Sequence, residues 1–527
     1  MTIPIPTPWT LLRCQQLAKS NEAPSSSEIT FIRAVESETT ARLTRLEDEI
    51  LRLRHRLDEL QAERDQLSAY HSQNLSILSP LRRLPPEVLA EIFSWSLPAI
   101  REMAGTTSDL KKSPWVLAQV NRRWREVSLS TPLLWSTVCV SYMGLDASGF
   151  PPPEMIQAQI DRVGQTLKIH FSASESCVPD EQHDMFELLS AHSARWEDLD
   201  IQLNAALFPR LAALRGRLPS LRRLWIQWDN ADSDDEQTGV GSIKCFETAS
   251  SLVDVGVKSE SRFIPILLPA YQLTSYRLHG PWEMHERVLK LAPNLVEARV
   301  IIAFDSSEWP NAINSAIDLP HLRRLYTTHV EVLDHLRTPA LSEIAFWLDH
   351  DQIHQEDPFD RLDAFFVRSS CTPQQLCLKG FPDASTTAEI LKKYPSITSF
   401  VLIINSFDDE DVGQDVLVNA VDTHLTMLTL GNDPISPHLR SISFATTQSI
   451  PIDYPLFLKM LQSRRRNPYS ALCSAAFLTR EGPDPDPVTR VRLEALRDAG
   501  LGLCVESGQK TNMRMDLWTC ECSWNAS

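Results

Sequence analysis

The stretch "LPSLRRLWIQW" at residues 218–228 joins a proline turn to an apolar run of the length of one β-strand. Related stretches recur along the chain, and their strand-like cores lie about 20–32 residues apart, a period typical of solenoids. They cover residues 193–203, 268–280, 292–302, 319–330, 338–350, 372–381, 394–404 and 436–445. Helix-like stretches such as 285–292 and 387–394 lie between them. We therefore predict strands that alternate with helices.

One repeat of this kind cannot bury its own apolar face, so successive repeats stack and share a core. Alternate apolar residues of each parallel strand face the inside, and the following helix covers the convex side. Residues 141–527 are thus predicted to form an α/β domain, an irregular leucine-rich-repeat-like solenoid that binds a target. The alternative is an unrelated α/β domain in which the proline turns coincide.

Tryptophan occurs in two of the predicted strands. Trp225 lies between Leu224 and Ile226, and Trp347 follows Phe346. One alternating set should point inward and the other outward. Because tryptophan is enriched among residues that dominate binding energies, we predict that Trp225 and Trp347 contribute to the surface of the solenoid that binds a target protein. The alternative is that both rings belong to the core.

A different pattern occupies residues 79–98, "SPLRRLPPEVLAEIFSWSLP". Pro86 suits the first helical position, and Glu87 lies in the first turn, where the helix dipole favours negative charge. One helical face then carries Val88, Leu89, Ile92 and Phe93. A helix of about three turns is marginal in water, so its apolar face needs a cover.

Residues 113–140 repeat this organisation. Ser113 and Pro114 start a second predicted helix. Its apolar stripe consists of Val116, Val120, Trp124 and Val127. Thr131 and Pro132 open a third short helix. So small a bundle cannot hide all of this apolar surface, which indicates a site for a partner.

Taken in order, "LPPEVL" with "IF", then "VNRRWREV", then "PLLW" resemble the F-box. The resemblance assigns residues 79–140 to an F-box domain, with an inserted polar loop at 98–113. It implies docking on the Skp-type adaptor of a cullin–RING ubiquitin ligase. The residues implied to contact the adaptor, or to shape the surface it meets, are Leu84, Pro85, Glu87, Leu89, Ile92, Phe93, Trp124 and Trp135. The alternative is a structural three-helix cap on the next domain.

The same resemblance implies a substrate receptor without catalytic activity. In a Skp–cullin–F-box (SCF) ligase the other subunits transfer ubiquitin, and the receptor raises the effective concentration of a target lysine. The expected partners are the adaptor, a cullin and an unidentified target protein, which undergoes ubiquitin-dependent degradation. The alternative is a scaffold that binds the adaptor alone.

In front of the box, residues 29–78 predict a coiled-coil helix, since no Gly or Pro occurs between Ile29 and Ser79. The apolar seam consists of Ile29, Ile32, Leu43, Leu46, Ile50, Leu53, Leu57, Leu60 and Leu67, and is interrupted by Glu36, Thr39 and Arg64. Charges of both signs flank it, as at e and g positions. The seam predicts either a homodimer or packing within the chain. Fungal F-box proteins that this chain resembles often carry such a helix.

Composition limits the remaining functions. A net charge of −17 argues against nucleic-acid binding as the main task, and the basic stretch 462–467 is predicted to be a solvated loop. Acidic stretches at 229–237 and 406–415 are also predicted to be loops. Residues 1–28 are rich in Pro and Ser and are predicted to be disordered.

We predict no signal peptide and no membrane span, and therefore a location in the cytoplasm or nucleus with reduced cysteines. The pair Cys520 and Cys522 is too closely spaced to hold zinc alone, and residues 349–357, "DHDQIHQED", are predicted to be a surface loop. Phosphate-loop, dinucleotide, HExxH and GxSxG motifs do not occur. We expect no enzymatic activity, no cofactor and no metal.

Overall fold

The computed structural model describes residues 8–97, 113–142, 152–174, 179–204, 207–228, 241–259, 263–304, 316–348, 358–405, 414–431, 435–448, 450–480, 482–508, 511 and 515. It contains two compact units, Met1–Leu89 and Ala90–Ser527. Several segments with predictions fall outside the described residues. They are the inserted loop, most of the two acidic stretches, "DHDQIHQED" and the closely spaced cysteine pair.

The first unit begins with helix α1, Pro8–Lys19. We predicted disorder for residues 1–28; residues 8–19 form this helix instead, and residues 1–7 lie outside the described part of the chain. The guanidinium of Arg13 lies 3.1 Å from the carboxylate of Glu22 and 3.0 Å from that of Glu28. These pairs join residues 9 and 15 positions apart, so a local reading of composition does not reveal them.

Helix α2, Ser26–Leu78, is 53 residues long and confirms the predicted long helix. It starts with a capping box, in which Glu28 N–H donates to Ser25 Oγ and Ser25 N–H donates to the Glu28 carboxylate at 2.7 Å. These hydrogen bonds and the one from Arg13 lower the pKa of Glu28 to about 2. All of α2 is described, and none of its side chains is buried. Among the described helices, none is both long and apolar enough to cross a membrane.

Five short elements precede the sheet: η1 Pro80–Arg82, α3 Pro86–Ser96, α5 Pro114–Val120, α6 Arg122–Leu129 and η3 Pro132–Trp135, where η denotes a 3-10 helix. The second unit is built on one sheet of 14 strands, each parallel to the next and in chain order. The α/β solenoid prediction is confirmed. The sheet starts at Thr137, inside the range that we assigned to the F-box.

The strands are β1 Thr137–Ser141, β2 Leu167–Ser172, β3 Trp196–Leu203, β4 Arg223–Trp228, β5 Asp254–Lys258, β6 Ser275–Gly280, β7 Glu297–Ile302, β9 Arg324–Thr327, β11 Glu343–Leu348, β12 Gln375–Gly380, β13 Ser399–Ile404, β14 Ser441–Thr446, β15 Ser474–Thr479 and β16 Gly502–Ser507. A separate pair joins β8 Ile317–Asp318 and β10 Leu336–Arg337.

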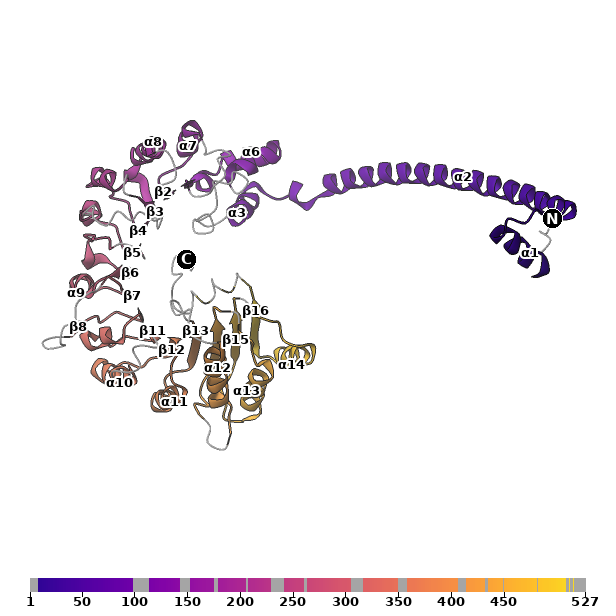
Figure 1. Ribbon diagram of the computed structural model, residues 1–527. Helices are drawn as coiled ribbons and strands as arrows, with labels where there is room; N and C mark the ends of the chain where they lie inside the picture. The colour runs from indigo at the N-terminus through magenta and orange to yellow at the C-terminus, as the bar shows by residue number, and fades with distance from the viewer. Residues whose placement is uncertain are drawn as a thin grey trace. The chain divides into compact units, whose positions relative to one another are not determined.

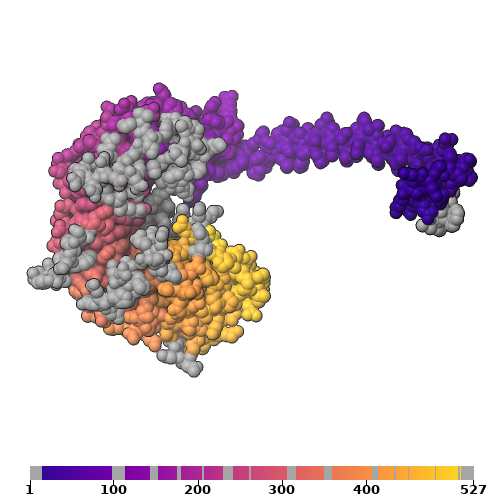
Figure 2. All heavy atoms as spheres, in the orientation of Figure 1, coloured from indigo at the N-terminus to yellow at the C-terminus, as the bar shows by residue number. Residues whose placement is uncertain are grey.

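Helices connect the strands and lie along one side of the sheet (Figure 1). They are α7 Pro153–Ile160, α8 Pro179–Ser190, η4 Ser193–Arg195, η5 Phe208–Leu214, η6 Cys245–Thr248, η7 Ala270–Gln272, α9 Trp282–Lys290, η8 Val330–His335, α10 Pro358–Ser369, α11 Ala384–Lys393, α12 Gln414–Leu428, α13 Tyr454–Arg466 and α14 Pro487–Asp498. From β11 onward every connection contains an α-helix, whereas most of those between β3 and β11 are 3-10 turns. This change of connection explains the irregular repeat length, and the repeats still pack in chain order (Figure 2).

The strand register aligns side chains in rows across the sheet. One row faces the helices and consists of Ile169, Leu199, Leu224, Val255, Tyr276, Ala298, Leu325, Ile344, Leu376, Phe400, Ile442 and Ala475. All twelve are buried and form the core between sheet and helices. We call this side the helix face and the opposite side the inner face.

The basic stretch 462–467 is not the solvated loop that we predicted, because it mostly belongs to α13. Arg464 is fully buried. Its Nε donates to Leu428 O at 2.9 Å, and its two Nη atoms donate to Ser436 O and Ile435 O, each at 3.0 Å. Burial lowers the pKa of Arg464 to about 10. The two arginines that follow it are exposed, so three residues of one type have different roles.

Candidate protein-binding surfaces

Helix α3 carries two apolar stripes where we predicted one. Leu89 and Phe93 are fully buried, whereas Val88, Ile92 and Trp95 are 44%, 41% and 82% exposed. The exposed residues are spaced i, i+4 and i+7, which places them on one side of the helix. Exposed apolar side chains gathered on one helix side are typical of a protein-binding surface.

The chain from Val116 to Val127 was predicted to be one helix, but it forms two, α5 and α6. Asn121 separates them in an extended conformation, with φ −161° and ψ 173°. Its Oδ1 accepts a hydrogen bond from Trp124 N–H at 2.9 Å and thereby caps α6. This cap fixes the start of α6, and the Trp124 ring lies against that of Phe93, with centroids 4.7 Å apart.

The third predicted helix is the 3-10 turn η3, which buries Trp135 completely. Trp135 Nε1 donates to Ser128 O at 2.8 Å, and its ring meets Trp115 edge-on, with centroids 4.9 Å apart. The guanidinium of Arg162 lies 4.8 Å from the Trp115 centroid and 5.2 Å from that of Trp135. Trp135 therefore belongs to the core that joins the short helices to the first repeat.

The eight residues predicted for adaptor binding fall into three groups. The exposed ones are Pro85, Glu87 and Ile92, the half-buried ones are Leu84 and Trp124, and the buried ones are Leu89, Phe93 and Trp135. The buried three can only shape the surface. Sequence reasoning missed Trp95, although its spacing of three from Ile92 and seven from Val88 identifies it. Trp95 Nε1 donates to Glu91 Oε1 at 2.8 Å, which holds the indole along the helix.

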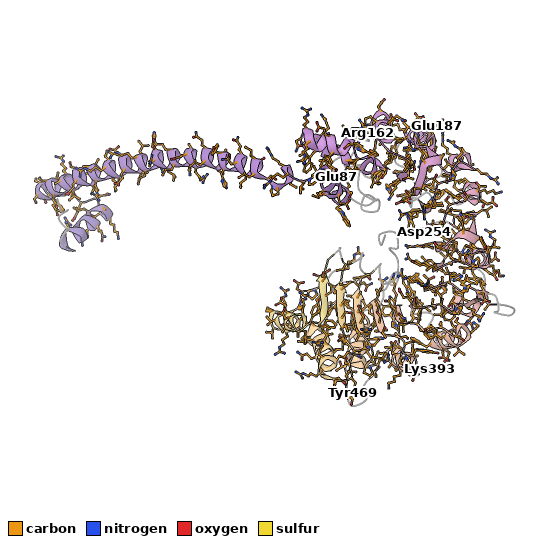
Figure 3. All side chains as sticks on the ribbon, turned by 180° about the vertical axis from the view of Figure 1, so that it is seen from behind. Glu87, Arg162, Glu187, Asp254, Lys393 and Tyr469 are labelled. Atoms are coloured by element: carbon orange, nitrogen blue, oxygen red, sulfur yellow. The ribbon has the colours of Figure 1, made fainter. Side chains whose placement is uncertain are left out.

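The inner face of the first repeats carries a row of charges. It runs Lys168, Asp198, Arg223, Asp254, Ser275, Glu297 and Arg324. Arg223 donates to both carboxylate oxygens of Asp198, at 2.7 and 2.6 Å. Burial raises the pKa of Asp254, whose side chain lies on the inner face (Figure 3). Most of these charges pair across strands, so the row joins neighbouring repeats.

The two tryptophans predicted to bind the target differ in their surroundings. Trp225 is buried on the inner face. Its ring lies over Gly256 on the next strand, where an added Cβ would come within 2.0 Å of the ring, and the Arg277 guanidinium lies 5.0 Å from its centroid. Trp347 is half-buried, with Lys379 Nζ 4.9 Å from its ring centroid. This geometry assigns Trp225 to packing and leaves Trp347 as a candidate contact.

Replacement of Trp225 by alanine is expected to lower stability by about 3–5 kcal/mol, since it removes a buried ring that fills the space above Gly256. Replacement of Trp347 should cost about 1 kcal/mol, because that ring is partly in water. Denaturant unfolding of both variants checks this difference. Equal losses would mean that Trp347 is also core.

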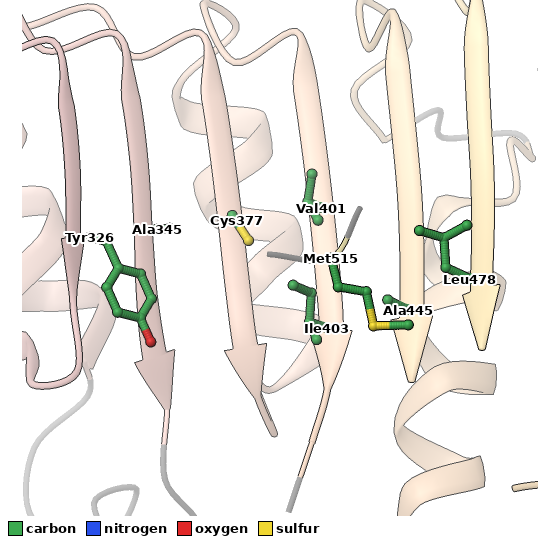
Figure 4. Packing of buried hydrophobic residues seen from close by; sticks show 8 residues of the cluster. All are labelled: Tyr326, Ala345, Cys377, Val401, Ile403, Ala445, Leu478 and Met515. Carbon is green, nitrogen blue, oxygen red and sulfur yellow. The ribbon is translucent and has the colours of Figure 1, made fainter. Parts of the chain in front are cut away.

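The inner face of the later repeats carries a group of apolar side chains among polar ones such as Lys379 and Ser443. One register row contains Tyr326, Ala345, Cys377 and Val401, and the next contains Ile403, Ala445 and Leu478. These seven side chains are buried, and we call them the apolar strip. Met515, which follows β16 in the chain, packs against them (Figure 4). The two ends of the inner face thus differ in chemistry.

In the part of the chain that the structure describes, no group of three or more His, Cys, Asp or Glu side chains is placed to hold a metal. No model of a known protein family matches the chain, and no curated protein matches it significantly. The resemblance to the F-box therefore stays a prediction.

Proposed function

We propose that the chain is a non-catalytic substrate receptor of a Skp–cullin–F-box ubiquitin ligase. The observation that carries the proposal is the exposed stripe on α3, whose opposite side is anchored by buried Leu89 and Phe93. The stripe docks on the Skp-type adaptor through Val88, Ile92 and Trp95. Covering such side chains on association contributes about 1.5–3 kcal/mol each.

The parallel sheet supplies the second half of the function. Its register holds inner-face side chains in fixed rows over 14 strands, which gives a large preorganised surface for a target protein. The ligase's other subunits perform the chemistry, and the receptor keeps a target lysine close to them.

The double variant Ile92→Asp, Trp95→Asp is expected to lose capture of the Skp-type adaptor, by at least about a hundredfold in Kd, because two charges replace apolar contacts. Both side chains are exposed in the chain itself, so the melting temperature should not fall. Tyr469→Asp is the matched control, since Tyr469 is about as exposed as Trp95 and lies beyond α13, far along the chain.

Undiminished adaptor capture by the double variant, measured by pull-down with purified adaptor, would refute the docking surface. A cullin that is captured together with the adaptor supports the ligase receptor. Capture of the adaptor without a cullin would instead support the scaffold.

A further inference from the structure

The apolar strip groups seven apolar side chains on an inner face that elsewhere carries charged and polar ones, including Lys379 and Ser443 in the same register rows. Its seven residues come from β9, β11, β12, β13, β14 and β15, and every one is buried. Ile301 and Cys504 pack against its two edges. The corresponding surface of the first repeats carries ion pairs. A surface of this composition needs a cover, since about 25 cal/mol is lost for each Å² of apolar area left in water.

Met515 supplies part of that cover. It is 4% exposed, and its side chain lies against β13 and β14 (Figure 4). Thr511 is also buried, and its Oγ1 donates to Thr479 O, at the end of β15, at 3.1 Å. Gly508, with φ +107°, provides the turn after β16, and its N–H donates to Thr479 O at 3.0 Å. Thr511 and Met515, the two described residues beyond Gly508, therefore both lie against the sheet that they follow, Met515 on its inner face.

We propose that the apolar strip is the target-binding site and that Met515 occupies it until a target displaces it. The target presents an unbranched or γ-branched apolar side chain, such as Met or Leu, in a short linear segment. Met515 shows that such a side chain fits there, because Met is unbranched and adapts to an uneven surface formed by large and small residues. The description of this occupant as a target rests on the proposed function.

The competition has a defined consequence. A target must bind the strip better than the tethered Met515 does, and the tether gives Met515 a high effective concentration. Weak apolar segments therefore do not bind, and removal of the Met515 side chain raises the affinity for all of them.

Cys377 allows the cover to be measured in the full-length chain, because its thiol lies within the strip and is fully buried. Replacement of Met515 by Asp should increase the rate of Cys377 alkylation by at least about tenfold, as expected when a local cover opens. Met515→Leu should retain the protection. Cys245 is buried in η6, away from the strip, and reports any global unfolding, while exposed Cys473 calibrates the reagent.

The second arm tests the chemistry of the occupant. A synthetic peptide of residues 508–527, added to the Met515→Asp chain, should restore the protection of Cys377. The same peptide with Asp at position 515 should not restore it. If Cys245 also reacts faster in the Met515→Asp chain, Met515→Gln replaces it as the milder variant.

An unchanged Cys377 rate in these variants, or equal protection by both peptides, would overturn the inference. The labelling is read on the isolated chain, so the result does not depend on adaptor docking. Failure of adaptor capture and failure of this inference are therefore separate outcomes.

Discussion

Replacement of Leu53 and Leu57 by alanine is expected to convert a dimer of the full-length chain into a monomer. Both residues belong to the seam of α2, and both are more than half exposed, at 63% and 55%. Each buried leucine truncated in a helical seam costs about 2–5 kcal/mol, and the variant truncates two in each copy. Association should therefore weaken by several orders of magnitude. Light scattering of both proteins measures the mass directly.

The pairing itself is our proposal, and charge complementarity of α2 with a second copy supports it. In a parallel, in-register pair, Arg42 lies opposite Glu47 of the other copy and Glu49 lies opposite Arg54. In an antiparallel pair centred between residues 50 and 53, Glu49 meets Arg56 and Glu47 meets Arg54. The helix is thus self-complementary in either direction. A helix with no buried side chain also needs a partner for stability.

Leu51→Ala is the matched control. Leu51 is 67% exposed, as much as the seam leucines, but lies at a b position outside the seam. It should leave the mass and the helix content unchanged. A wild-type chain that is monomeric at micromolar concentration would contradict the pairing and favour packing of α2 within the chain.

Replacement of Arg464 by Met is expected to lower stability by about 3–5 kcal/mol, the largest single-residue loss that we predict outside the aromatic core. Methionine fills much of the volume but removes the guanidinium donors from the carbonyls of Leu428, Ile435 and Ser436, of which Ser436 O keeps only its bond from Leu439 N–H at 3.2 Å. Ser436 has a positive φ of 45°, so its backbone depends on the hydrogen bond from Arg464 more than an ordinary turn does.

Hydrogen exchange of α12 and α13 measures this loss locally, because stacked repeats open in segments. Arg464→Lys should give an intermediate loss, since one ammonium group cannot reproduce the planar arrangement of donors. Arg466→Met is the control, because Arg466 is exposed on the same helix and its loss should be within about 0.5 kcal/mol. Similar exchange in both Met variants would show that the buried guanidinium is dispensable.

The parallel strands were predictable because their signal is local. Each proline turn is followed within a few residues by its apolar run, as in 218–228, and strand β4 falls at the end of that stretch. The seam of α2 is equally local, since three- and four-residue spacings define it. The alternation of faces at Trp225 was also predictable, but its burial over Gly256 was not, because the glycine lies on the next strand.

The features that were missed depend on contacts between distant residues. Arg13 of α1 donates a hydrogen bond to Glu28 of α2, 15 positions later. Arg464 is buried against carbonyls about 30 positions earlier in the chain. No spacing rule distinguishes Arg464 from Arg466. Met515 is a further example. It packs against side chains from six strands, and all of these strands lie well before residue 515 in the sequence.

The regular spacing of the parallel strands also limits the length of motif that the chain can recognise. Neighbouring strands present equivalent side chains about every 4.8 Å, whereas an extended peptide presents same-side residues about every 6.7 Å. Two steps of the peptide, about 13.4 Å, therefore match about three strand spacings, about 14.4 Å, and longer matches drift out of phase. A peptide lying across the strands can keep only two or three side chains in step with the rows. The pitch of the sheet thus favours recognition of a short motif, whatever the length of the protein that carries it.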